Sequence, residues 1–410
     1  MKPLYRQVQP SMTMGLDQQA RELAASGKDI INLTAGQVDL PMPEAGKEAI
    51  RQALQADRTG YVPATGSPEV KAAVRARMGW EEGEVLLSAG AKPLLHAAVA
   101  CLCGPGDEVI LPTPCYTSYP EMVRLAGGQP ILVLGDPGND LIVSGAAVES
   151  HITDRTKAIL LNNPVNPTGA MHDRKALREI ADICISHDLY LIADEVYDAF
   201  VYEGVFVSLY AFPDLRDRLI LVNSASKTYA MAGLRLGYAV SPEPVAQAMG
   251  AYLSHALGCP CSLSEQAALA VLSMKNGYER ELLSVFRDRR DRLFEALSKI
   301  GGWTVKKNAG AFYLWIDLSK MDDDVAFCQK LLQREGVALT PGSAFGCPGY
   351  VRLAYTKDIS ALLDAAGRME RFVKETYSRS SGVRSWIGDS SLSKVKTEIK
   401  YPSSSVVKNR

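Results

Sequence analysis

Short apolar runs recur along the middle of the chain, and segments with helical spacing of apolar residues lie between them. Several runs are apolar throughout, as expected of strands that are covered on both faces. Strands that alternate with helices in this way predict an α/β fold with a seven-stranded, mainly parallel sheet. The predicted strands are Glu84–Ser88, Glu108–Leu111, Pro130–Leu134, Ala158–Leu161, Leu189–Ala193, Leu219–Asn223 and Gly237–Val240. The predicted helices are Pro93–Cys101, Thr117–Leu125, Arg174–His187 and Pro244–Ala256.

The pattern changes after Glu281, where a long amphipathic segment leads into shorter strands. We therefore expect two domains, a large one from residues 46–281 and a smaller α/β one from residues 1–45 and 282–377. In the second part of the smaller domain, the amphipathic segment is Leu282–Ile300, and two further helices are predicted at Asp323–Glu335 and Ile359–Tyr377. The predicted strands are Trp303–Lys306, Ala311–Ile316 and Tyr350–Tyr355.

The composition is that of a globular chain, with 47% hydrophobic and 22% charged residues. No apolar run approaches the ~18 residues that a membrane-spanning helix needs, and the first residues lack the apolar stretch of a signal peptide. We therefore expect a cytoplasmic protein with no membrane partner. The 45 basic and 46 acidic residues give a net charge of −1, which is not the electrostatic signature of a nucleic-acid-binding protein.

The charge is unevenly distributed. Residues 378–410 contain ten serines, seven basic and two acidic residues, which gives this tail a net charge of +5 and leaves −6 on residues 1–377. The tail has no apolar periodicity and carries no site motif. We therefore predict that it is disordered.

The eight cysteines include two Cys-x-Cys pairs, Cys101/Cys103 and Cys259/Cys261. A zinc site would need Cys-x-x-Cys spacing and a second cysteine or histidine pair nearby. We therefore predict no metal site and interpret the cysteines as reduced side chains that pack as small hydrophobic groups.

Polar residues gather where four of the predicted strands end. Ligands of open α/β sheets bind beyond the carboxyl ends of the strands, so these segments together predict one site at one edge of the sheet. The segments are Ala89-Gly90-Ala91-Lys92, Asn162-Asn163-Pro164-Val165-Asn166-Pro167-Thr168-Gly169, Asp194-Glu195-Val196-Tyr197 and Ser224-Ala225-Ser226-Lys227.

Each segment alone has another interpretation. Asn-Pro-Thr-Gly is a good turn sequence, and a single lysine is usually a solvated surface charge. A strand that ends in Asp194-Glu195 also resembles the magnesium-binding strand end of a nucleotide hydrolase. The sequence lacks the Gly-x-x-x-x-Gly-Lys-[Ser/Thr] loop of such an enzyme, and it also lacks the Gly-x-Gly-x-x-Gly turn of a Rossmann dehydrogenase.

Taken together, the segments resemble the class I/II aminotransferases, which are pyridoxal-phosphate enzymes of fold type I. The main match is Ser224-Ala-Ser-Lys227-Thr-Tyr-Ala-Met-Ala-Gly233-Leu-Arg235, which fits the lysine signature of that family. The resemblance extends over residues 30–372. The other matching motifs, in the family's order, are Asn163–Gly169, Asp194–Tyr197, Gly310–Tyr313, Pro341–Phe345 and Val351–Tyr355.

The resemblance implies a role for each polar side chain of the site. Lys227 would form a Schiff base with the cofactor and move the proton at the substrate's α-carbon. Asp194 would pair with the pyridine nitrogen, and Tyr197 and Asn166 would hydrogen-bond the phenolic oxygen of the cofactor. Arg352 would bind the α-carboxylate of the substrate with two hydrogen bonds. We expect burial and nearby cations to lower the pKa of Lys227 from its usual value of about 10.4.

The phosphate of the cofactor needs hydrogen-bond donors. Ser224 and Arg235 match the family's phosphate ligands, and Ser226 and Lys92 are further cofactor-binding candidates. Gly90 and Ala91 precede a predicted helix whose N-terminal amides and dipole favour an anion.

Three further residues match family positions. Tyr116 corresponds to the aromatic residue that stacks on the cofactor ring, where it also borders the substrate. Gly36 corresponds to a backbone contact with the substrate. Tyr61 corresponds to a tyrosine that reaches the phosphate from the partner subunit, which predicts a homodimer with shared active sites.

The resemblance leaves the reaction open. We favour an aminotransferase that passes the amino group of an L-amino acid to a 2-oxo acid, and elimination, replacement or cyclisation on the same fold is the alternative. The chain departs from the usual family pattern at Gln37-Val38, at Asn308, where a proline is usual, and in Ser254–Cys261, where His255 either faces the substrate or packs. No cation for a distal carboxylate can be placed. We do not expect a transcription regulator, because no DNA-binding domain fits before residue 30.

Overall fold

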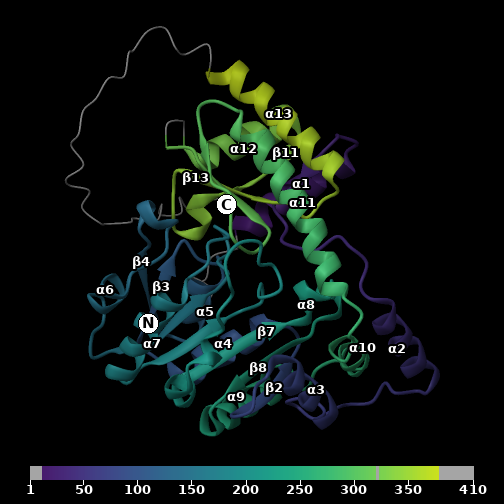
Figure 1. Cartoon of the computed structure of the whole chain (residues 1–410), viewed down its shortest axis with the longest axis vertical. Helices are drawn as coiled ribbons and strands as arrows, with labels where there is room; N and C mark the ends of the chain where they lie inside the picture. The colour runs from purple at the N-terminus through teal and green to yellow at the C-terminus, as the bar shows by residue number, and fades with distance from the viewer. Residues whose placement is uncertain (1–11, 320–322, 378–410) are drawn as a thin grey trace, which may run out of the picture.

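The computed structural model describes residues 12–319 and 323–377, and the predicted disordered tail lies outside these ranges. Its dominant feature is a seven-stranded sheet in the lower half of Figure 1. All seven predicted strands form, each within two residues of its expected bounds. They are β2 (Glu84–Ser88), β3 (Glu108–Thr113), β4 (Gln129–Leu134), β5 (Thr156–Asn162), β6 (Tyr190–Asp194), β7 (Leu219–Ser224) and β8 (Gly237–Ser241).

The strand order is β2-β8-β7-β6-β5-β3-β4. Neighbours from β7 to β4 are parallel, and only β8 runs antiparallel, to β2 on one side and to β7 on the other. The expected mainly parallel α/β fold is therefore confirmed. Asn162 at the end of β5 lies beside Asp194 at the end of β6, and Asp194 lies beside Val222 of β7. This register brings three of the polar strand ends together.

Helices cover both faces of the sheet, which explains why its strands are apolar throughout. Ile159 belongs to the same buried cluster as Leu177, and the next residue, Leu160, belongs to the cluster of Leu94 on the opposite face. The first face carries α3 (Pro68–Met78), α6 (Gly145–Glu149), α7 (Arg174–Ser186) and α10 (Ser262–Leu272), and the second carries α4 (Ala91–Leu102), α5 (Tyr119–Leu125) and α9 (Glu243–Ala256).

A second, smaller layer lies above the large sheet in Figure 1 and has its own core around Phe286, Phe312 and Phe372. It contains a four-stranded antiparallel sheet, β12-β13-β10-β9, and a parallel pair, β1 with β11. The strands are β1 (Ile31–Asn32), β9 (Thr304–Val305), β10 (Tyr313–Asp317), β11 (Val337–Ala338), β12 (Thr340–Pro341) and β13 (Tyr350–Ala354). The helices are α1 (Met12–Ala25), α11 (Tyr278–Ser298), α12 (Asp324–Glu335) and α13 (Ile359–Tyr377).

Ala20, Leu33 and Val38 of the N-terminal segment thus pack with the C-terminal half, as the pattern suggested, whereas the boundaries at residues 45 and 281 stay predictions. Six of the described helices were not expected from the sequence: α1, α2 (Glu44–Gln55), α3, α6, α8 (Ala225–Thr228) and α10. The helix α10 consists largely of small apolar residues and packs against α2, so it lacks the polar stripe that marks an amphipathic helix. None of the described helices is long and apolar enough to cross a membrane.

Candidate active site

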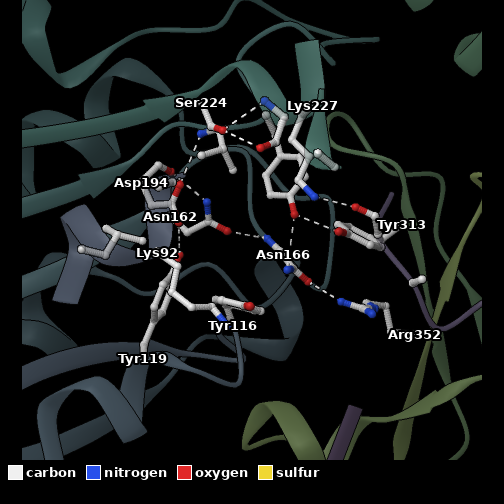
Figure 2. A pocket seen from close by; sticks show the side chains of 18 of the residues that line it. Lys92, Tyr116, Tyr119, Asn162, Asn166, Asp194, Ser224, Lys227, Tyr313 and Arg352 are labelled. Carbon is white, nitrogen blue, oxygen red and sulfur yellow. Dashed lines mark hydrogen bonds between the residues drawn. The ribbon is translucent and has the colours of Figure 1, made fainter. Parts of the chain in front are cut away.

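A pocket of about 340 Å³ lies beyond the carboxyl ends of β5, β6 and β7, where the large sheet meets the smaller layer (Figure 2). All four polar strand ends contribute to it, together with residues from the N-terminal segment and β13. The structure therefore brings together almost every residue that the sequence singled out. Those that line the pocket are Gly36, Ala91, Lys92, Tyr116, Asn166, Asp194, Tyr197, Ser224, Ser226, Lys227, Arg235 and Arg352.

Lys227 projects into the pocket from α8 (Ala225–Thr228), a single helical turn that follows β7 directly. Ser224 starts this turn, since its Oγ accepts a 3.0 Å hydrogen bond from the Ser226 N–H. The Lys227 Nζ donates a 2.5 Å hydrogen bond to the carbonyl of Gly36. Burial lowers the pKa of Lys227 to about 8, and the positive charges of Arg352 and Arg235 act in the same direction.

Asp194, at the end of β6, is buried and held on both carboxylate oxygens. The hydroxyl of Tyr119 donates to Oδ2 at 2.6 Å, and the Val196 N–H donates to Oδ1 at 3.3 Å. Burial raises the pKa of Asp194 to about 6, while these two hydrogen bonds and the charge of Lys227 oppose the rise.

A chain of hydrogen bonds connects Asn162 with two tyrosines of the pocket. The Asn166 N–H donates to Asn162 Oδ1 at 2.6 Å, and the Asn166 Nδ2 lies 3.4 Å from the hydroxyl of Tyr197. The Tyr197 hydroxyl in turn lies 2.8 Å from that of Tyr313. Burial raises the pKa of Tyr197 well above its usual value of about 10, so Tyr197 is a neutral phenol at neutral pH.

Arg352, on β13, is a buried cation with a fixed orientation. Its Nη1 donates to Asn166 Oδ1 at 2.9 Å and its Nη2 donates to the carbonyl of Thr34 at 2.5 Å. The guanidinium carbon lies 4.5 Å from the centre of the Tyr313 ring. Its Nε is buried and has no hydrogen-bond partner among the described residues, so the group keeps a donor for an incoming anion.

A compact set of donors lies at the other end of the pocket, where α4 begins. Gly90 has a φ of +100°, and a Cβ there would lie 2.3 Å from Arg235 Nη2. A Cβ on Gly237 would lie 2.3 Å from the carbonyl carbon of Gly90. The start of α4 therefore lies against the backbone of β8 and the Arg235 guanidinium. Helix amides, a guanidinium and the hydroxyls of Ser224 and Ser226 are the groups that bind a phosphate.

Comparison with known proteins decides the family. The model of the aminotransferase class I and II family matches residues 28–368. The chain belongs to this family. It is similar to the probable aspartate/prephenate aminotransferase of Aquifex aeolicus, with 36% identity over 90% of this chain and 97% of that protein. The aspartate aminotransferase of Geobacillus stearothermophilus is 35% identical over 89% of this chain and 96% of its own length.

The solved structures agree with this assignment. The aspartate aminotransferase of Thermus thermophilus with maleate has a TM-score of 0.86 to this chain and is 35% identical to it. The similarity covers 90% of this chain and 99% of that one. The chain is therefore an aminotransferase of fold type I, from a family of enzymes that use pyridoxal phosphate, and the predicted fold and enzyme class are confirmed.

Two candidate site residues, Gly90 and Tyr61, lie outside the lining of this pocket, and so does His255. Gly90 lies next to the pocket, against the guanidinium of Arg235. Tyr61 is fully exposed, and its predicted role in a partner's site stays a prediction. His255 is an exposed residue in the last turn of α9 and does not line this pocket, so its role stays open.

The sequence analysis gave no role to several residues that border the aminotransferase pocket. Tyr119 and Tyr313 had a usable signal: Tyr119 is three residues after Tyr116, one turn away, and Tyr313 ends the Gly310–Tyr313 motif. No sequence signal pointed to Asp17 and Thr34, because their position beside the pocket depends on how the N-terminal segment packs against the rest of the chain.

Proposed function

We propose that this aminotransferase binds pyridoxal phosphate through Lys227 and transfers the amino group of an L-amino acid to a 2-oxo acid. The observation that supports this proposal most strongly is the arrangement of three groups in one pocket. A lysine with a lowered pKa shares the pocket with a buried aspartate and with a buried arginine that keeps an unpaired donor among the described residues. This set provides a nucleophile, a partner for a protonated ring nitrogen and a carboxylate receptor.

The donor set fits the cofactor along its whole length. The amides at the start of α4, Arg235 and the two serine hydroxyls would bind the phosphate, and Asp194 would accept a hydrogen bond from the ring nitrogen. Tyr116 would stack on the ring, and Tyr197 and Asn166 would donate to its phenolic oxygen. When bound, pyridoxal phosphate supplies an electron-withdrawing ring that stabilises charge at the substrate's α-carbon.

The remaining residues of the pocket act on the amino acid. Arg352 would bind the α-carboxylate through its unpaired Nε and a neighbouring N–H, while Asn166 and Thr34 keep the guanidinium in place. This contact would hold the amino acid in the same pocket as Lys227. Once its Nζ is free, Lys227 would remove the α-proton and return it to another atom, because a pKa near 8 allows both steps at neutral pH.

We further propose that aspartate is one amino donor, on the strength of relatives named for aspartate. The pocket has four cationic side chains, and three already have roles. Lys92, the fourth, lies over the Tyr116 ring at 5.4 Å and forms no hydrogen bond or ion pair within the described ranges. It is the cation available to a second carboxylate.

The assembly that we propose is a homodimer in the cytoplasm, in which Tyr61 reaches the phosphate of the partner's cofactor. Tyr61 is completely exposed, so its side chain is free to contact a second subunit. The eight cysteines are all unpaired, which fits a reducing compartment. Sedimentation should show a dimer, and Tyr61→Phe should weaken cofactor retention; a fully active monomer would contradict shared sites.

Two experiments test the reaction. Reconstituted protein should show the visible absorbance of a lysine-bound cofactor, and Lys227→Ala should lose it. Amino acid added without a 2-oxo acid should then convert the cofactor to its amino form in one half-reaction. If substrate is consumed while the lysine-bound form persists, the elimination or cyclisation alternative is correct. A wild-type protein that stays colourless after reconstitution refutes the cofactor assignment.

A further inference from the structure

Asp17 is a second acidic residue on the wall of the pocket, besides Asp194. It lies on α1, its side chain is 23% exposed, and it borders the same cavity as Lys227 and Arg352. Its Oδ2 pairs with Arg21 at 2.7 Å, but the Arg21 side chain is 73% exposed, so this surface pair contributes little. The other carboxylate oxygen, Oδ1, faces inward; its nearer partner is Asn32, and the hydroxyl of Thr34 lies 3.4 Å from it.

The inward oxygen of Asp17 orients the amide of Asn32. Asn32 Nδ2 donates to Asp17 Oδ1 at 2.7 Å. An ionised carboxylate only accepts hydrogen bonds, so it keeps the nitrogen of the Asn32 amide on its own side. The amide oxygen of Asn32 must then face Thr34, and it accepts from the Thr34 N–H at 3.0 Å and from the Thr34 hydroxyl at 2.7 Å.

Thr34 connects the Asn32 amide to Arg352 in the proposed substrate site. Its side chain is buried, and its carbonyl accepts the hydrogen bond from Arg352 Nη2. The other acceptors of the guanidinium are Asn166 Oδ1 at 2.9 Å and, at the longer distance of 3.5 Å, the hydroxyl of Thr340. The carbonyl of Thr34 therefore helps to decide which edge of Arg352 stays open to an anion.

We propose that Asp17 is a positioning residue for α-carboxylate recognition, acting through the Asn32 amide and the Thr34 carbonyl on Arg352. The proposal rests on the proposed function, because it needs Arg352 to bind the substrate carboxylate. Without Asp17, the Asn32 amide is free to turn over, and its nitrogen then faces the N–H of Thr34. The backbone of Thr34 loses its acceptor, and Arg352 loses a fixed partner.

The test compares two substrates on cofactor-loaded enzyme. L-Aspartate has both carboxylates, whereas β-alanine keeps the distal carboxylate and lacks the α-carboxylate. In Asp17→Ala, kcat/KM for the half-reaction of L-aspartate should fall by about tenfold or more, mainly through KM. The slow half-reaction of β-alanine and the affinity for pyridoxal phosphate should change less than about twofold.

Further variants separate positioning from folding. Asp17→Asn can still present an oxygen to Asn32, so its KM for L-aspartate should lie between those of wild type and Asp17→Ala. Asn32→Ala should resemble Asp17→Ala, and the double variant should be no worse than either single one, because both break the same chain of contacts. Glu22→Gln, an exposed acid on the same helix, should behave as wild type.

Two results would overturn the proposal. The first is an unchanged KM for L-aspartate in Asp17→Ala, and the second is an equal loss for both substrates, which indicates a purely structural role. If wild-type holoenzyme reacts with no amino acid, the proposed function itself is wrong, and that failure is visible before any variant is made.

Discussion

The hydroxyl of Tyr119 donates a 2.6 Å hydrogen bond to Asp194 Oδ2, and both residues are buried. The ring of Tyr119 also meets the ring of Tyr116 edge-on, with 5.5 Å between their centres. Tyr119 thus contacts two groups of the proposed cofactor site. It fixes the carboxylate of Asp194, which we propose to bind the ring nitrogen, and it packs against Tyr116, which we propose to stack on the ring. Its two contacts can be separated, because only one of them needs the hydroxyl.

Tyr119→Phe should keep the ring contact and remove the hydrogen bond. This bond lowers the pKa of Asp194 against the effect of burial, so the pKa of Asp194 should rise above its present value of about 6. Asp194 is ionised only above its pKa. Affinity for pyridoxal phosphate, titrated by visible absorbance, should therefore fall as pH drops, and in the variant the fall should begin at a higher pH.

Tyr252→Phe is the matched control for this variant, since it removes a hydroxyl that contacts His96 between α4 and α9. It should leave the pH profile of cofactor binding unchanged. Identical profiles for Tyr119→Phe and wild type would contradict the role of this hydrogen bond.

Loading of the cofactor should depend on the charge of Lys227. The neutral amine is the nucleophile, so the loading rate should rise with pH and reach its midpoint near 8. Arg352→Gln removes a positive charge that lowers the pKa of Lys227, and the midpoint should move to higher pH. Stopped-flow absorbance between pH 6 and about 10 measures both profiles.

Lys175→Gln removes a similar charge from an exposed position on α7 and should not move the loading midpoint. An Arg352→Gln midpoint at or below that of wild type would show that Arg352 does not influence Lys227.

Gly90→Ala should weaken binding of the cofactor's phosphate. The added Cβ would lie 2.3 Å from Arg235 Nη2, and the φ of +100° is unfavourable for alanine. Gly106→Ala is the control, because Gly106 has a φ of +97° and open space around its Cβ position. Both variants should lose thermal stability, but only Gly90→Ala should raise the Kd for pyridoxal phosphate, by about tenfold or more. Equal Kd values would place the phosphate elsewhere.

Gly36→Ala should disturb the substrate end of the pocket. A Cβ on Gly36 would lie 2.0 Å from the hydroxyl oxygen of Tyr313, which shares a hydrogen bond with Tyr197. Tyr313 must move, and the KM for the amino acid should rise several-fold. Gly301→Ala, where nothing lies within 4 Å of the added carbon, is the control. Steady-state kinetics with saturating cofactor measures both variants, and a Gly36→Ala enzyme with normal KM would show that Tyr313 is not needed there.

The large sheet and the residues at its strand ends could be predicted from the sequence because they depend on local patterns. Asp194 follows a buried apolar run directly, and Lys227 lies in a signature of fixed spacing. The hydrogen-bond partners of these residues could not be predicted in the same way. Tyr119 is 75 positions from Asp194, and Asp17 is more than 300 positions from Arg352, so only packing brings them together.

The pairing of β2 with β8 has a consequence for how the chain acquires its site during synthesis. Ser88 lies opposite Gly237, and Glu84 lies opposite Ser241, so the edge strand made early has no partner until about 150 more residues have been translated. The close contact between Gly90 and Gly237, beside the proposed phosphate site, forms only once β8 has been made. A nascent chain that stalls before β8 exposes an unpaired strand edge and has no phosphate site, which makes this stage the point of greatest risk for aggregation.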